Sequence, residues 1–161
     1  MGTGKSAVGR RASSLLDLDF LDSDAEIVRS EGRLIEDIFA QDGEAEFRRL
    51  ESVFIDSGHP DAGCLVSCGG GMVVQPGVGE RLARRGIVIV LFASPDTILS
   101  RISGNRKRPL LNVEDPGARI AELLRERADA YRSAGAGVST DNRSIEEVAD
   151  HVARIYRAKV A

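Results

Sequence analysis

The chain has 161 residues, of which 42% are apolar and 29% charged, so we expect one soluble globular domain, 1–161, and exclude a disordered or fibrous chain. The net charge of −3 argues against broad binding to nucleic acid or to an anionic membrane surface. The longest apolar run, 87–93, is far shorter than the ~20 residues of a membrane helix and no secretion-signal pattern is found, so the cytoplasm is the expected location.

Segments with helical periodicity alternate with short β-rich runs, which predicts an α/β fold with a parallel sheet covered by helices. Strands are predicted at 18–22, 64–68, 87–92 and 137–140. Helices are predicted at 5–16, 25–31, 34–40, 44–57, 78–85, 96–102, 118–131 and 145–159, with Ser144 as the N-cap of the last. Cys64 and Cys68 lack partners at metal-ligand spacing, so both are expected to be reduced thiols.

The first residues carry a glycine-rich motif, since 2–6 reads Gly-Thr-Gly-Lys-Ser. It matches the second half of a phosphate-binding loop, in which Lys5 would reach the β- and γ-phosphates and Ser6 would ligate Mg²⁺. The spacing to Ala7 also fits a dinucleotide fingerprint, with Asp22 and Asp24 where a ribose-binding acid belongs. The lysine and hydroxyl residue favour the phosphate loop, although a chance turn is a further alternative.

Two carboxylates and three glycines follow predicted strands, at the edge where open α/β sheets bind ligands. The two-residue spacing of Asp22 and Asp24 would place both carboxylates on one side of an extended backbone, for metal or substrate hydroxyls. Alternatively, Ser23 or Asp24 only caps a helix beginning at Ala25. Residues 69–71 are all glycine, which lets a ligand approach the backbone or simply makes a flexible turn.

Arginines at three further places are candidates for binding an anion. Arg48 shares a helix face with Glu44 and Glu51, which indicates either a ligand-binding cation or a surface salt-bridge ladder. Arg127 stands four residues before Tyr131 on a predicted helix, where an ordinary solvated face is the alternative. The basic segment 103–115 suits a lid over transferring phosphates, or a solvated loop.

Taken in this order, these elements resemble the shikimate kinase family of P-loop kinases. The motifs that carry the resemblance are Gly2-Thr-Gly-Lys-Ser6, Phe20-Leu-Asp-Ser-Asp24, Ile38-Phe39 with Gly43-Glu44 and Phe47-Arg48, Gly69-Gly-Gly71, Arg108-Pro-Leu-Leu111 and Glu126-Arg-x-x-x-Tyr131. The combination favours the phosphate loop over the dinucleotide site. The resemblance implies a three-layer P-loop kinase fold, whose parallel sheet has five strands in the family, with a lid at about 103–115.

The resemblance also implies the activity: transfer of the ATP γ-phosphoryl group to the 3-hydroxyl of shikimate, with Mg²⁺ as cofactor, by a monomer. The implied ATP-binding residues are Gly2, Thr3, Gly4, Lys5, Ser6, Ala7, Arg101, Arg108 and Arg143. The implied substrate-binding residues are Asp24, Arg48, Gly69, Gly70, Gly71 and Arg127. Ser6 and Asp22 would hold the metal, and Lys5, Asp24 and Arg108 would be catalytic.

The sequence departs from the family at its beginning, where the family has a strand that ends in the first glycine of the loop. That strand lies in the middle of the family's sheet, so we expect two neighbouring strand edges to be unpaired without it. Met1 stands where the family often has an internal methionine, which predicts that the reading frame extends upstream. The alternatives are a non-catalytic homologue that binds shikimate or nucleotide, and a kinase for another hydroxy acid such as gluconate.

Overall fold

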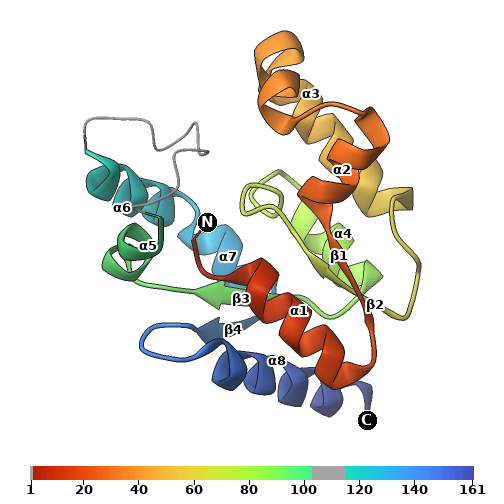
Figure 1. The fold of residues 1–161 in the computed structure, drawn as a ribbon, viewed down its shortest axis with the longest axis vertical. Coiled ribbons are helices and arrows are strands. Elements are labelled where there is room, and N and C mark those ends of the chain that lie inside the picture. Colours follow the sequence, from red (N-terminus) through yellow and green to blue (C-terminus); the bar gives the residue numbers. More distant parts are fainter. Residues whose placement is uncertain (1, 103–114) are drawn as a thin grey trace.

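The computed structural model describes residues 2–102 and 115–161, in which helices alternate with short strands (Figure 1). In chain order the elements are α1 (Lys5–Leu16), β1 (Asp19–Asp22), α2 (Ser23–Glu31), α3 (Ile35–Ser57), β2 (Cys64–Ser67), α4 (Val78–Arg85), β3 (Ile89–Phe92), α5 (Pro95–Ile102), α6 (Pro116–Glu126), α7 (Ala128–Ala134), β4 (Ala136–Ser139) and α8 (Ile145–Val160). No helix in these two ranges is long and apolar enough to span a bilayer.

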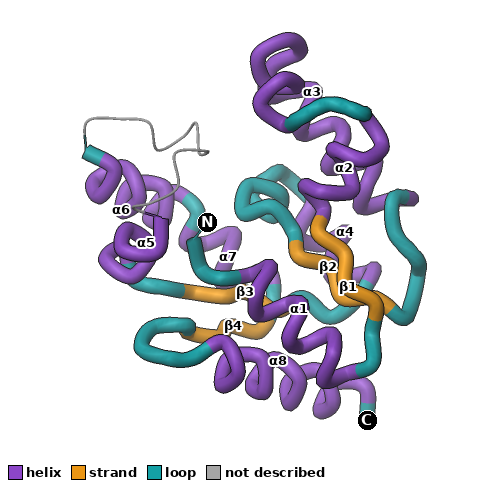
Figure 2. The backbone as a smooth tube through the Cα atoms, in the orientation of Figure 1, coloured by secondary structure: helices purple, strands orange, loops and turns teal. Residues whose placement is uncertain are grey.

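The four strands form two separate parallel pairs, drawn in orange in Figure 2. Strand β1 pairs with β2 so that Asp22 lies beside Ser67, and β3 pairs with β4 so that Phe92 lies beside Ser139. Within the described part of the chain, β2 and β3 are not hydrogen-bonded to each other. The predicted parallel strands are therefore confirmed, and the unpaired edges of β2 and β3 agree with the expectation for a sheet without its middle strand.

One core lies where α1 and α8 pack against each other and against the strands. Helix α1 contributes Val8 and Ala12, strand β4 contributes Val138, and α8 contributes Val148 and Val152, all less than a tenth exposed. The apolar positions of α8 recur at three- and four-residue steps, so they form one stripe that faces this core. This packing holds α1 against α8 and the strands, and so orients its N-terminus.

A second core holds the opposite side of the molecule, where α2, α3 and α4 meet. Its largest fully buried side chains are Ile38, Ile55 and Met72. Met72 directly follows the three glycines, so its burial anchors that turn to the body of the domain. A smaller cluster of Ile98, Ile102 and Ile120 joins α5 to α6.

Some helix ends agree with the sequence and others differ. Ser144 caps α8 as predicted, since its hydroxyl accepts a hydrogen bond from the Glu147 amide at 3.2 Å and the Glu147 carboxylate accepts one from the Ser144 amide at 2.8 Å. The predicted helix 25–31 begins earlier, at Ser23, because the Asp22 side chain is its N-cap. The expectation that Ser23 or Asp24 caps this helix was therefore wrong.

The predicted single helix 118–131 is two helices, α6 and α7, which are separated at Arg127. Arg127 has φ −100° and ψ 0°, outside regular helical geometry, and no glycine or proline in this segment announces the break. The predicted interruption between 40 and 44 is confirmed: Gly43 has φ 82° and ψ 175° and kinks α3. A positive φ of this kind suits glycine because it has no Cβ.

Candidate functional site

The N-terminus of α1 opens into a cavity of about 280 Å³. Gly4 caps the helix in the left-handed conformation, with φ 87° and ψ 17°, and no acidic residue stands in the first turn. The first-turn amides and the positive end of the helix dipole therefore favour an anion at this place. The cavity is lined by Gly2, Gly4, Lys5, Ser6, Ala7, Arg101 and Ile102.

Two oxygen-bearing side chains meet beside this cavity. The Ser6 hydroxyl donates a hydrogen bond to Asp22 Oδ2 at 2.7 Å, and its oxygen lies 3.4 Å from the Ser67 hydroxyl oxygen. The contact joins the first turn of α1 to the carboxyl ends of β1 and β2. A hydroxyl and a carboxylate, beside a cavity suited to phosphates, fit Mg²⁺, which takes few protein ligands and keeps several waters or phosphate oxygens.

Asp24 lies two residues after Asp22, in the first turn of α2 rather than on the strand. Its backbone amide donates to Asp22 Oδ1 at 3.2 Å, so capping, and not an extended backbone, brings the two carboxylates together. Burial and the neighbouring Asp22 charge raise the pKa of Asp24, while Lys5 opposes the shift. A buried carboxylate with a raised pKa, near the charges of Lys5 and Arg48, is suited to accept a proton.

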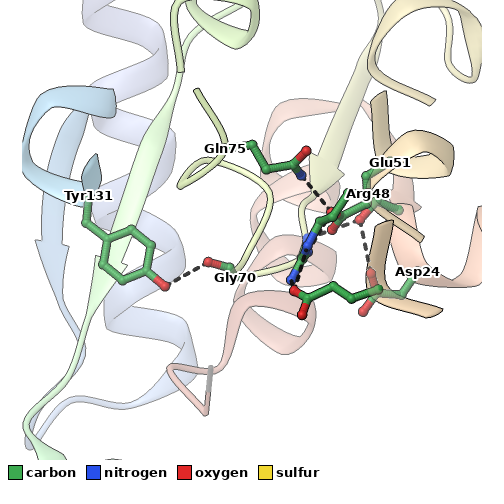
Figure 3. Close-up of polar contacts among 9 residues, drawn as sticks. Asp24, Arg48, Glu51, Gly70, Gln75 and Tyr131 are labelled. Carbon is green, nitrogen blue, oxygen red and sulfur yellow. Dashed lines mark hydrogen bonds and ion pairs between the residues drawn. The ribbon is translucent and has the colours of Figure 1, made fainter. Parts of the chain in front are cut away.

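Arg48 and Glu51 form a half-buried ion pair on α3 (Figure 3). Arg48 Nη1 donates to Glu51 Oε2 at 2.6 Å, Arg48 Nη2 donates to Glu44 Oε1 at 2.8 Å, and Gln75 Nε2 donates to Glu51 Oε2 at 2.9 Å. Burial raises the pKa of Glu51, although Arg48 pulls it down. Burial lowers the pKa of Arg48, but its hydrogen bonds to Glu51 and Glu44 outweigh that effect and raise it.

The turn of three glycines, 69–71, packs directly against these charged groups. A Cβ on Gly71 would lie 2.6 Å from Arg48 Nη2, and one on Gly69 would lie 2.9 Å from Glu51 Oε1 and 3.1 Å from Asp24 Oδ1. Only residues without a side chain allow so close an approach. The turn therefore lies directly beside Arg48, Glu51 and Asp24.

Comparison with known proteins identifies the family of this site. The sequence model "Shikimate kinase" matches residues 1–157. The chain belongs to the shikimate kinase family. A shikimate kinase of Caldanaerobacter subterraneus subsp. tengcongensis is 39% identical over 156 residues, covering 97% of this chain and 91% of that protein. One of Thermus thermophilus is 43% identical over 153 residues, covering 94% and 83%.

Solved structures of the family have the same fold. A shikimate kinase from Acinetobacter baumannii, in complex with shikimate, aligns with a TM-score of 0.92 and 34% identity, covering 99% of this chain and 89% of that one. One from Aquifex aeolicus aligns with a TM-score of 0.84 and 29% identity, covering 99% and 94%. The predicted family, its kinase activity and its α/β fold with parallel strands are therefore confirmed.

The remaining expected nucleotide residues are held in different ways. Arg101 lines the cavity and donates to the Thr140 hydroxyl and carbonyl oxygens, both at 2.9 Å. Arg143 instead donates to the carbonyl oxygens of Ser139, at 3.0 Å, and Glu147, at 2.8 Å. The geometry thus ties Arg143 to the β4–α8 connection. Arg108 and the lid, 103–115, lie outside the described residues, except for residue 115.

Arg127 stands at the break between α6 and α7, and no hydrogen bond or ion pair within the described ranges engages its guanidinium. A cation at this position remains available to a bound anion. The structure therefore places the two expected carboxylate-binding arginines on separate helical units, Arg48 on α3 and Arg127 at the start of α7.

Several residues that build the site have no predicted role in the sequence. Glu51 was part of an expected surface ladder, but its side chain is fully buried. Ser23 accepts a hydrogen bond from the Gly69 amide at 3.1 Å, and the Tyr131 hydroxyl donates to the Gly70 carbonyl oxygen at 2.7 Å. No motif or spacing in the sequence marks Gln75 as a residue of the site. For Glu51, the signal available was its place three residues after Arg48 on an apolar face.

Proposed function

We propose that this chain transfers the γ-phosphoryl group of ATP to the 3-hydroxyl of shikimate, with Mg²⁺ as cofactor. The observation that carries the proposal is that groups suited to phosphates, to a metal ion and to a substrate hydroxyl lie next to one another. The N-terminus of α1, with Lys5, suits the phosphates; the Ser6–Asp22 contact suits the metal; Asp24 follows within one turn of α2.

The hydroxy acid would be held on the side of Asp24 that is away from Lys5 and the N-terminus of α1. Shikimate carries one carboxylate and three hydroxyls, and planar guanidinium groups bind carboxylates through paired hydrogen bonds. We assign this role to Arg48 and Arg127, with the backbone of Gly70 against the ring. The family member from Acinetobacter baumannii was solved in complex with shikimate, which supports a shikimate site in this fold.

Phosphoryl transfer needs positioning and charge neutralisation more than covalent catalysis. The 3-hydroxyl oxygen would attack the γ-phosphorus, the bond to the bridging oxygen of ADP would break, and the hydroxyl proton would pass to the Asp24 carboxylate. Lys5 would neutralise phosphate charge, as would Arg108 from the lid. Mg²⁺, when bound by Ser6 and Asp22, supplies further neutralisation of the phosphates. Gly2, Thr3, Gly4 and Ala7 would complete the phosphate cradle, with Arg101 and Arg143 near the base.

The test is ADP release measured with ATP and Mg²⁺ in the presence of shikimate, of gluconate, or of neither. Release that depends on shikimate supports the proposal. Release with gluconate alone indicates a different hydroxy-acid kinase, and binding without release indicates a non-catalytic homologue. Replacement of Arg127 by alanine should raise the KM for shikimate by about 10- to 150-fold, the loss of one charge-assisted hydrogen bond. An unchanged KM would remove Arg127 from the carboxylate site.

A further inference from the structure

The turn 69–71 is fixed from two sides by hydrogen bonds to distant elements. On one side the Gly69 amide donates to the hydroxyl of Ser23, which is fully buried at the start of α2. On the other side the Tyr131 hydroxyl of α7 donates to the Gly70 carbonyl oxygen at 2.7 Å (Figure 3). The Met72 amide donates to the Gly69 carbonyl oxygen at 3.0 Å and closes the turn.

A shift of this turn would be transmitted to the charged groups beside it. Gly71 packs against the Arg48 guanidinium and Gly69 against the carboxylates of Glu51 and Asp24, each with no space for even a methyl group. Close-packed groups move together, because displacing one without the other opens a gap or makes a clash. The turn is therefore one of the contacts that limit where the Arg48 guanidinium can lie, beside its hydrogen bonds to Glu51 and Glu44.

Tyr131 also belongs to the helix that begins at the second arginine. The Tyr131 amide donates to the Arg127 carbonyl oxygen at 3.0 Å, so the two residues are one helical turn apart. Helix α7 has seven residues, of which one, Ala134, is buried, and its N-terminus has no side-chain cap. With so little burial of its own, α7 depends on contacts such as the Tyr131 hydroxyl for its place beside the glycine turn.

We infer that Tyr131 is a positioning residue that fixes the spacing between Arg127 and Arg48 by holding the Gly70 carbonyl oxygen. The inference rests on the proposed function, because it assigns both arginines to one carboxylate. Removal of the Tyr131 hydroxyl should therefore affect one half of the site and not the other. Loss of the hydroxyl weakens recognition of the substrate's carboxylate, and leaves the nucleotide half of the site, around Gly4 and Arg101, unaffected.

The test is Tyr131→Phe, which removes the hydroxyl and keeps the ring. Tyr156→Phe, on α8, is the matched control. The Tyr131 variant should show a KM for shikimate raised by about 2- to 10-fold, the loss of one neutral hydrogen bond, with the KM for ATP and kcat changed by less than about twofold. Incorporation of 4-aminophenylalanine at 131 restores a donor and should recover part of the affinity. The control should match the wild type in all three constants.

A second substrate separates positioning from general loosening of the site. With the analogue whose carboxylate is reduced to hydroxymethyl, the variant and the wild type should have the same KM, because the two arginines then have no anion to share. An equal rise for both substrates, a rise in the KM for ATP, a variant that does not fold, or an unchanged KM for shikimate would each overturn the role of Tyr131. A wild-type chain without shikimate-dependent ADP release would refute the proposed function itself, and the role of Tyr131 with it.

Discussion

Gly71→Ala is the substitution that most directly tests the closeness of the glycine turn to Arg48, the proposed carboxylate-binding arginine. The added methyl carbon would lie 2.6 Å from Arg48 Nη2, 2.8 Å from Nη1 and 2.9 Å from Cζ. Non-bonded atoms of this kind pack at about 3.5 Å, so the guanidinium must move by about 1 Å. Gly71 does not have a positive φ, so alanine adds this clash without backbone strain.

The displaced guanidinium loses its alignment with the substrate carboxylate. One charge-assisted hydrogen bond contributes about 1.5–3 kcal/mol, which corresponds to a KM for shikimate raised by about 10- to 150-fold. The KM for ATP should stay within about twofold of the wild type, because the cavity at α1 does not include this turn. Steady-state kinetics with each substrate varied in turn, by coupled detection of ADP, measures both constants.

Gly79→Ala is the matched control. Its Cβ would meet Val73 Cγ2 at 3.7 Å, an ordinary van der Waals contact, and alanine inside α4 should stabilise the helix by about 0.5–1 kcal/mol. The control should keep the kinetic constants of the wild type. A Gly71→Ala enzyme with the wild-type KM for shikimate would refute the assignment of Arg48 to the carboxylate, as would equal losses in the two alanine variants.

Three further predictions concern the capping of α8, the buried carboxylate and the metal site. Ser144→Ala removes one half of the capping box with Glu147 and should lower stability by about 1 kcal/mol, a fall in Tm of about 2–4 °C by calorimetry, with unchanged kinetics; an unchanged Tm contradicts it. Burial raises the pKa of Glu51 above its ordinary 4.5, so the folded state binds this proton more tightly than the unfolded chain, and stability falls as pH rises from 4.5 through the folded pKa. Glu51→Gln should therefore be at least as stable as the wild type at pH 7 in urea unfolding and lose this advantage as pH falls towards 4.5; the reverse trend would contradict the pKa direction. Asp22→Asn, which can still cap α2, should raise the Mg²⁺ concentration needed for half-maximal rate, whereas exposed Asp19→Asn on the same strand should not, and equal Mg²⁺ requirements would exclude Asp22 as a ligand.

Local features of the fold could be read from the sequence because their causes lie within a few residues. The Ser144 cap depends on a hydroxyl three residues before a glutamate, and the kink at Gly43 depends on a glycine between two periodic segments. The proposed phosphate site follows from glycines before Lys5 at a helix start. Most predicted strand ends differ from the observed ones by one or two residues, because pairing with a neighbour decides where a strand stops.

The half of the site that we propose binds the hydroxy acid could be predicted only in part. Arg48 and the glycines 69–71 stood out by residue type, but the sequence could not show that they touch, because 20 or more residues separate them. The break at Arg127 has no local signal, so the sequence predicted one continuous helix. Glu51 looked like one more exposed charge because it pairs with Arg48 at salt-bridge spacing, although it also lies on the apolar face of α3.

By itself, the sequence determined the α/β class, the family and the chemical kinds of group available to the substrates, since these follow from composition, periodicity and short motifs. Tertiary structure alone decided that Glu51 is buried beneath Arg48 and that Tyr131 meets Gly70 across 61 positions. The physical reason is that hydrogen bonds and desolvation depend on distances in space, which a linear pattern does not encode for residues far apart in the chain.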